Sequence, residues 1–462
     1  MLAKRLALRA LTALLVLAVA WLSTGRLRLE QDDRTDEPEW TAISVVTARQ
    51  LSGATPPGVQ RDRNAGDLAD DAWRQGVQAT TFGWSNPILH KLVWAAACEP
   101  VAPERLRPNL FFRYHKGDPA RANAAIQPLL PAIERARLVV AAASALCGLL
   151  LFLIAKRLVG WPGGVIALAL WLFHPLVRAW SHQARPDFGM LALVLATLYV
   201  ALASEAWLRG SRGRGKQLGA AALLGLVAGL AAGAKLNGGL AGVFAVGAVL
   251  VAALAGTQDV PSNVEAPTRP SWVVTLGALA LTGTAFTFTL FACLPYLWSA
   301  PIEHMSDVLD FWSEHMAFQQ DRIEALGGTA TRTTGEQVAL VAGRIGGADE
   351  PLQAALGVPA GWLWIGALAG GWWQLRRRAA AADEAAEAGA TSARRVPLRL
   401  TLLWLVVVLL GSTLWIPLEW DRYLFAPVSC AILLQAVVIG AILRRLVAKA
   451  RPRSLSAESP SG

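Results

Sequence analysis

The stretch that decides the fold is MLAKRLALRALTALLVLAVAWLSTGRLRLEQDDRTDEPEW, residues 1–40. Its apolar run, from about Leu6 to Leu22, has roughly the length at which a helix crosses a bilayer. Three cations precede or open this run: Lys4, Arg5 and Arg9. Positive charge at one end of a span favours the cytoplasmic side. The polar segment 26–40 is therefore expected on the opposite, extracytoplasmic side, close to the membrane.

The same run has features of a cleavable signal peptide, because basic residues precede it and Ala-Val-Ala (18–20) lies near its end. We favour a retained anchor, since the site described below needs a carboxylate that stays tethered to the membrane.

The composition indicates a polytopic membrane protein. Of 462 residues, 54% are hydrophobic and 16% are charged. The net charge of +10 also suits nucleic-acid binding, but the Lys and Arg residues cluster in short loops, which membrane topology explains better. The four cysteines are Cys98, Cys147, Cys293 and Cys430, and three of them lie in expected apolar helices. The cysteines therefore indicate neither a disulfide framework nor a zinc site.

Hydropathy predicts an all-α polytopic membrane protein with about ten transmembrane helices. The third span is expected at about 161–177. The apolar run 218–255 is about twice as long as one span, so we expect two helices joined by a turn at 235–239. The expected order is a first span at 1–25, an extracytoplasmic loop with Asp36-Glu37 at 26–135, spans two to six at 136–255, an inner loop and span seven at 256–294, an extracytoplasmic loop at 295–353, spans eight to ten at 354–443, and a basic tail at 444–462.

All strongly basic clusters fall on one side in this arrangement, which predicts a multi-pass protein with both termini in the cytoplasm. The extracytoplasmic loops are expected to carry short amphipathic helices. The same arrangement brings Asp36, Glu37, Asp187, Lys235 and Arg422 to the outer face.

Asp36 and Glu37 are candidate catalytic groups. Adjacent carboxylates repel, and a partly dry site raises the pKa of at least one of them, as a general base requires. The alternative is an acidic helix N-terminus, with Thr35 as the N-cap and Pro38 in the first turn. Both interpretations can hold, because a capped helix would orient the carboxylates.

Asp187 follows Arg185-Pro186 and is expected in the first turn of a helix, either as a catalytic carboxylate or as a partner of the helix dipole. Lys235 interrupts an apolar hairpin. An anion such as a lipid phosphate would be its natural partner, and Asn237 and the glycines after it would allow close backbone approach. The alternative is a lysine that extends to the membrane surface.

Arg422 and Tyr423 lie at the outer end of the last span. Arginine can hold a phosphate with two hydrogen bonds, although Tyr and Trp also serve as interfacial anchors. Asn86, His90 and Lys91 lie near the membrane surface, where they could line the entrance of a lipid site. A lone histidine is more often structural.

With these residues placed, the chain resembles the polyprenyl-phosphate-sugar-dependent membrane glycosyltransferases of the GT-C fold. This group includes protein mannosyltransferases, the aminoarabinose transferase of lipid A and the family related to rhizobial galacturonosyltransferases. The resemblance rests on five short motifs: Asp36-Glu37, Asn86-Pro87-Ile88-Leu89-His90-Lys91, Ala184-Arg185-Pro186-Asp187, Ala234-Lys235-Leu236-Asn237-Gly238 and Arg422-Tyr423-Leu424.

This resemblance implies GT-C architecture and a role for each motif. Asp36 would be the base, Asp187 the second acidic group, and Lys235 and Arg422 with Tyr423 would hold the carrier phosphate. One departure is Asn86, where aminoarabinose transferases carry a lysine, so this particular substrate pair is not expected. The large soluble module of eukaryotic protein mannosyltransferases is also absent from the sequence, which weakens the expectation of a protein acceptor.

The sequence therefore predicts an inverting glycosyltransferase of the bacterial plasma membrane. A polyprenyl-phosphate sugar would be the donor and a hydroxyl of a glycan, lipid or protein the acceptor, with no nucleic-acid partner. No cofactor is required, and the carboxylates are compatible with a divalent cation. Two other classes stay open: a transporter or flippase of polyprenyl lipids or sugars, with charges near the bilayer midplane, and a noncatalytic scaffold of an envelope-polysaccharide complex.

Overall fold

The computed structural model describes most of the helical core of the chain. The described residues are 37, 40–45, 87–102, 127–210, 213–256, 272–298, 300–325, 330–347, 369–373, 377, 395–414 and 424–450. Within these ranges the regular structure is helical and contains no β-strand. The predicted all-α class is confirmed.

Six described helices are long and apolar enough to cross a membrane, so the chain is a multi-pass membrane protein. They are α7 (Leu130–Val159), α12 (Arg214–Ala234), α13 (Leu240–Gly256), α14 (Trp272–Ala292), α19 (Arg395–Leu414) and α20 (Phe425–Ala450). Two shorter apolar helices, α8 (Trp161–Phe173) and α10 (Asp187–Ala203), accompany them. The expected first span at 1–25 and most of the eighth lie outside the described residues.

The third predicted span, 161–177, is divided into two helices. α8 ends at Phe173, and the six-residue α9 (Pro175–Trp180) follows after His174. Pro175 disfavours helical backbone at the residue before it, and His174 is extended, with φ −64° and ψ 125°. The run stays apolar on average across His174, so Pro175 is the residue that explains the break.

The predicted hairpin in 218–255 is confirmed. α12 ends at Ala234, the 3₁₀ turn η5 (Leu236–Gly239) follows, and α13 begins at Leu240. Gly238 is required in this turn because an added Cβ would lie 2.1 Å from the carbonyl oxygen of Ala231. The turn therefore folds back tightly against the end of α12.

A glycine stripe on α12 sets its contact with α14. Gly225, Gly229 and Gly233 are spaced by four and share one helix face. A Cβ at Gly225 would lie 2.2 Å from the carbonyl oxygen of Thr282, and one at Gly229 would lie 2.7 Å from that of Phe286. Small residues at this spacing let two membrane helices approach backbone to backbone.

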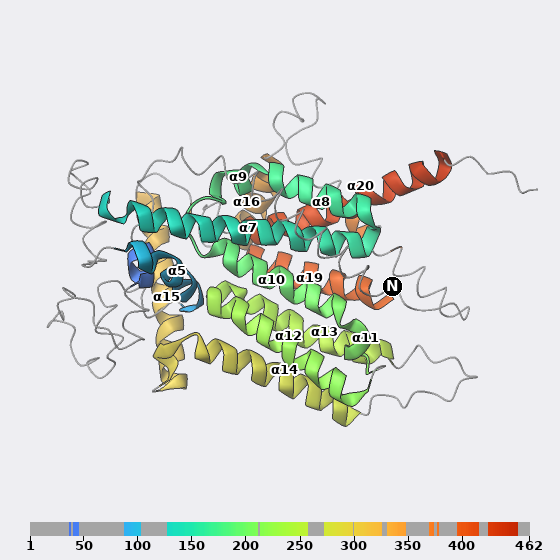
Figure 1. Cartoon of the computed structure of the whole chain (residues 1–462), viewed down its shortest axis with the longest axis horizontal. Helices are drawn as coiled ribbons and strands as arrows, with labels where there is room; N and C mark the ends of the chain where they lie inside the picture. The colour runs from blue at the N-terminus through green and yellow to red at the C-terminus, as the bar shows by residue number, and fades with distance from the viewer. Residues whose placement is uncertain are drawn as a thin grey trace, which may run out of the picture.

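The long helices run roughly side by side, and α5 (Leu89–Cys98) and α15 (Pro301–Ala325) lie at one end of them (Figure 1). We call this the α5 end of the bundle. α5 is fixed there by a 2.8 Å hydrogen bond from Ile88 N to the carbonyl oxygen of Cys293, just after α14. The Cys98 thiol donates to the carbonyl oxygen of Ala132 near the start of α7, at 3.1 Å.

Basic residues gather at the opposite end of the bundle. Lys156 and Arg157 lie in the last turn of α7, and Arg209 follows α11 (Glu205–Leu208), which Figure 1 places far from α5. α12 begins at Arg214 and α19 at Arg395. Lys156, Arg157, Arg209 and Arg214 therefore lie at the end of the bundle opposite α5.

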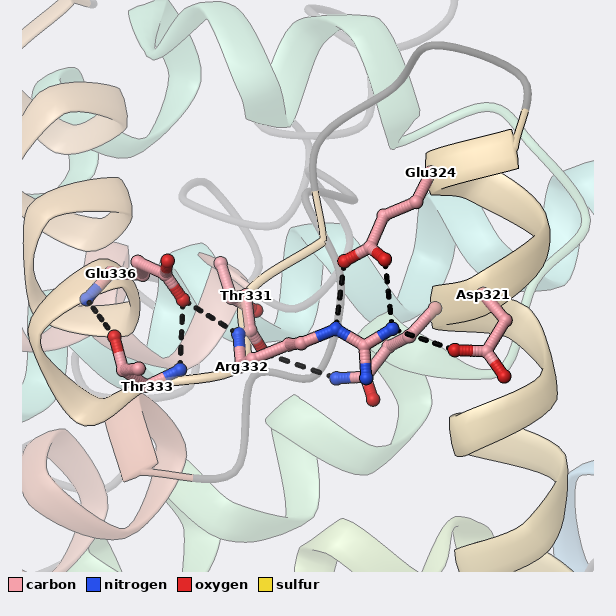
Figure 2. Close-up of polar contacts among 7 residues, drawn as sticks. Asp321, Glu324, Thr331, Arg332, Thr333 and Glu336 are labelled. Carbon is pink, nitrogen blue, oxygen red and sulfur yellow. Dashed lines mark hydrogen bonds and ion pairs between the residues drawn. The ribbon is translucent and has the colours of Figure 1, made fainter.

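Between α14 and α19, the described residues include α15 and α16 (Thr334–Gly347), and Arg332 links the end of α15 to the start of α16 (Figure 2). The Arg332 guanidinium donates to both carboxylate oxygens of Glu324 at 2.8 Å and to Asp321 at 2.6 Å. Its hydrogen bond to Glu324 lowers the pKa of that carboxyl group. These contacts tie the end of α15 to the segment that enters α16.

A capping box opens α16. Thr333 Oγ1 accepts from the Glu336 N–H at 3.2 Å, and Glu336 Oε2 accepts from the Thr333 N–H at 2.8 Å. The backbone hydrogen bonds from Thr333 and Arg332 lower the pKa of Glu336. The capping box therefore explains why α16 begins at Thr334.

Candidate functional site

An acidic and a basic side chain from different helices meet at the α5 end of the bundle. Asp187 is the first residue of α10, and Lys235 directly follows α12. Lys235 Nζ lies 2.6 Å from Asp187 Oδ1, and the exposed fractions of the two side chains are 18% and 4%. The pair is largely withdrawn from solvent, so its electrostatic attraction is weakly screened.

The local sequence explains how the two side chains reach each other. Pro186 precedes Asp187, so the carboxylate lies at the N-terminus of α10, where the helix dipole favours a negative charge. Lys235 leaves α12 with extended backbone, φ −161° and ψ 139°. This break in the helix separates the lysine from the apolar face of α12.

A second ion pair ties the N-terminal region to the bundle. Glu37 is 1% exposed, and its carboxylate accepts from Arg137 Nε at 3.0 Å and from Arg137 NH2 at 2.6 Å. The backbone N–H of Ala184 donates to Glu37 Oε1 at 2.6 Å. We call this arrangement, Glu37 with Arg137 and Ala184, the Glu37 clasp.

The clasp brings Glu37, the second residue of the first acidic motif, to the loop that leads into Asp187. Ala184 is three residues before Asp187, and Arg137 belongs to α7. Because both Glu37 oxygens accept hydrogen bonds, Glu37 is suited to hold this region in place. Asp36, the expected base, lies outside the described residues, and so do Asn86, Arg422 and Tyr423.

The loop between α9 and α10, residues 181–186, is polar in sequence yet mostly buried. Ser181, His182 and Gln183 are each less than a tenth exposed. Burial lowers the pKa of His182, the Arg137 charge lowers it further, and Glu37 opposes this. The Arg185 guanidinium lies over the Trp180 ring, 4.7 Å from its centroid, in a cation–π contact.

His90 and Lys91 are buried in α5. His90 Nδ1 lies 2.9 Å from the carbonyl oxygen of Ala234, directly before Lys235. Burial lowers the pKa of His90 to about 3, and the neighbouring Lys91 charge acts in the same direction. Burial also lowers the pKa of Lys91 to about 7.

The structure therefore brings three sequence-predicted groups together: Asp187, Lys235 and His90. Asn237 lies half-buried in η5, next to them along the chain. Sequence reasoning missed Arg137. The available signal was its position, since a cation at the start of a predicted span is expensive unless it has a partner.

No group of three or more His, Cys, Asp or Glu residues close enough to hold a metal ion occurs within the ranges that the structure describes. The described carboxylates of the site instead face cations, Lys235 and Arg137.

Residues 132–282 match the family described as dolichyl-phosphate-mannose-protein mannosyltransferase. The matched segment contains Arg137, Asp187 and Lys235. It therefore covers most of the described site, and it confirms the resemblance to membrane glycosyltransferases in this part of the chain. No curated protein matches the chain.

Solved structures of two kinds align with nearly the whole chain at low identity. ArnT from Cupriavidus metallidurans in the apo state aligns with a TM-score of 0.46 and 14% identity over 96% of this chain and 60% of that one. The Archaeoglobus fulgidus oligosaccharyltransferase AglB, in complex with an inhibitory peptide and a dolichol-phosphate, aligns with a TM-score of 0.47 and 11% identity over 96% and 51%. The chain thus spans between half and three fifths of the length of these proteins.

Proposed function

We propose that this chain is an integral membrane glycosyltransferase of the GT-C type. It would transfer a sugar from a polyprenyl-phosphate donor to an acceptor hydroxyl at the α5 end of the bundle, with inversion at the anomeric carbon. The observation that carries the proposal is the buried Asp187–Lys235 pair, which lies within the segment that matches the mannosyltransferase family.

The charge distribution supports an extracytoplasmic position for the α5 end. Basic residues mark the opposite end, at Lys156, Arg157, Arg209 and Arg214. Such residues favour the cytoplasmic side. With this orientation in a bacterial plasma membrane, both termini would be cytoplasmic and the site would meet a lipid-linked sugar at the outer leaflet.

In the proposed reaction, the acceptor oxygen forms a bond to the anomeric carbon while the bond from that carbon to the phosphate oxygen breaks. The electron pair of the broken bond stays on the polyprenyl phosphate. Lys235, with Arg422 and Tyr423, would stabilise the charge that develops on this leaving group. Asp36 would accept the proton of the acceptor hydroxyl.

The remaining residues would position these groups. The Glu37 clasp holds the segment that follows Asp36 against α7 and the 181–186 loop. Asp187 holds the Lys235 side chain through their ion pair. Asn86, His90, Lys91, Arg185 and Asn237 would line or shape the donor entrance. The proposed chemistry requires no cofactor, and a divalent cation remains compatible with it.

The location of the ion pair favours a transferase over a transporter. A transport pathway predicts charges near the middle of the bilayer. Asp187 is the first residue of its helix and Lys235 follows the last residue of its helix. Both charges therefore lie at one end of the bundle.

The test is a donor panel with the purified full chain in nanodiscs. Radiolabelled polyprenyl-phosphate sugars would be supplied with an extract of bacterial envelope glycans and lipids as acceptors. Release of polyprenyl phosphate with transfer of the label to an acceptor is the expected result. A parallel liposome assay would measure lipid movement. Movement of the intact donor across the bilayer without bond cleavage would instead identify a flippase, and neither activity would favour a scaffold.

A further inference from the structure

The contact between His90 and Ala234 joins α5 to the end of α12. The His90 Nδ1 and the Ala234 carbonyl oxygen are 2.9 Å apart, although 144 positions separate the two residues in sequence. A carbonyl oxygen only accepts hydrogen bonds. Nδ1 must therefore carry the hydrogen, and this contact fixes the tautomer of the ring.

Ala234 is the last residue of α12. The carbonyl groups of the last helical turn lack partners within their own helix and need other donors. His90 supplies such a donor from a separate helix. The peptide group that carries this carbonyl also carries the N–H of Lys235, which donates to Ala231 at 3.2 Å. Both sides of the peptide between Ala234 and Lys235 are therefore held by hydrogen bonds.

The His90 ring is itself held in place. It makes edge contacts with the rings of Trp40 and Trp94, at centroid distances of 5.4 and 5.6 Å. His90 is 6% exposed, and α5 is anchored through Ile88. A ring confined in this way restricts movement of the peptide that it contacts.

We propose that His90 is a positioning residue that fixes the backbone at Lys235 and so sets where Nζ can meet a phosphate. This inference rests on the proposed function for the role of Lys235 toward the donor. The positioning itself concerns the geometry of the free protein. His90 acts through the Ala234 carbonyl and touches neither reacting group.

Three substitutions separate the hydrogen bond from the bulk of the ring. His90→Asn keeps an amide donor close to the position of Nδ1. His90→Gln places its amide near the position of Nε2, and His90→Leu removes the donor. Loss of a hydrogen bond to a buried carbonyl changes an equilibrium constant by about fivefold to about 150-fold, which corresponds to on the order of 1–3 kcal/mol.

The first readout does not depend on any ligand. Competitive acetylation with mass spectrometry would measure the reactivity of the Lys235 amine in the full chain in nanodiscs, with exposed lysines as internal standards. We expect Lys235 to react several-fold faster in His90→Leu and His90→Gln than in wild type, and at about the wild-type rate in His90→Asn. Unchanged reactivity in His90→Leu would overturn the positioning proposal whatever the chain's activity.

The second readout is a double-mutant cycle on the binding of undecaprenyl phosphate. His90→Leu should weaken binding about tenfold in the wild-type background and have little effect in the Lys235→Ala background, because the two residues act as a unit. Equal effects in both backgrounds would show that His90 acts independently of Lys235 and would overturn the proposal. If Lys235→Ala itself binds the phosphate normally while the acetylation result holds, the proposed role of Lys235 fails and the positioning by His90 stands.

Discussion

Lys235 Nζ lies 2.6 Å from Asp187 Oδ1, across 48 positions of sequence and between two different helices. The pair joins the start of α10 to the turn that follows α12. Removing one partner of a buried ion pair leaves a charge without compensation and typically costs about 3–5 kcal/mol. Replacing both partners with apolar residues is often neutral. The contrast between these two cases provides a direct test.

We predict that Asp187→Asn lowers both the thermal stability and the glycosyl transfer rate, the latter by at least about tenfold. The double variant Asp187→Leu/Lys235→Met should recover most of the stability and none of the activity. Unfolding in nanodiscs, followed by tryptophan fluorescence, and a donor-release assay would measure the two effects. Wild-type stability of Asp187→Asn would show that the pair contributes little to the fold, and a double variant as unstable as the single one would contradict the expected recovery.

The ion pair of the Glu37 clasp should also stabilise the fold. Glu37→Gln retains the shape of the side chain and removes its charge, so Arg137 loses its ionic partner inside the protein. We expect a loss of stability of about 3–5 kcal/mol, with partial recovery in Glu37→Gln/Arg137→Met. Urea or thermal unfolding measures this effect. A Glu37→Gln variant with wild-type stability would contradict a structural role for the clasp.

The glycine stripe on α12 can be tested with a matched control on the same helix. Gly225→Ala would place a Cβ 2.2 Å from the carbonyl oxygen of Thr282, whereas a Cβ at Gly219 would meet nothing within 4 Å. We expect Gly225→Ala to destabilise the protein and Gly219→Ala to be neutral or slightly stabilising, because alanine favours helix over glycine. Similar melting temperatures for both variants would argue against the close α12–α14 contact.

The lowered pKa of buried His90 predicts that the folded protein loses stability in acid. The pKa of His90 is lowered to about 3 in the folded chain, mainly by burial, against an ordinary value of 6.5. The unfolded chain therefore binds a proton that the folded chain resists between these values, and stability falls as the pH drops from 6.5 toward 3. Above pH 6.5 this histidine contributes no pH dependence.

His90→Asn should flatten part of this slope and leave the remainder, because burial also lowers the pKa of His182. Melting temperatures of the wild type and the variant between pH 4 and 8 would show the difference. Parallel curves for the two proteins across this range would contradict a buried neutral His90.

Hydropathy and turn chemistry were sufficient to predict the helical class and the hairpin at Lys235. Apolar runs indicate buried or lipid-facing helices, and Gly238 and Gly239 mark the turn between α12 and α13. The division between α8 and α9 was not predicted, because hydropathy does not register the backbone effect of Pro175 on His174. The number of spans also depends on segments outside the described residues.

The site was predicted in part. The sequence indicated that Asp187 and Lys235 share one face of the membrane, and the structure shows that they form an ion pair. The sequence assigned Lys235 to a phosphate and gave no sign of this pairing, since contacts between distant segments depend on helix packing. Arg137, the partner of Glu37, was missed for the same reason.

The central claim is most directly tested by release of polyprenyl phosphate from the active donor in nanodiscs, with the wild type compared with Asp36→Asn and Lys235→Ala. Thermal melts would establish that both variants are folded and inserted. The account predicts release by the wild type and at least about a hundredfold less by each variant, which corresponds to roughly 2.7 kcal/mol of lost transition-state stabilisation. Release at the wild-type rate by both folded variants would contradict it.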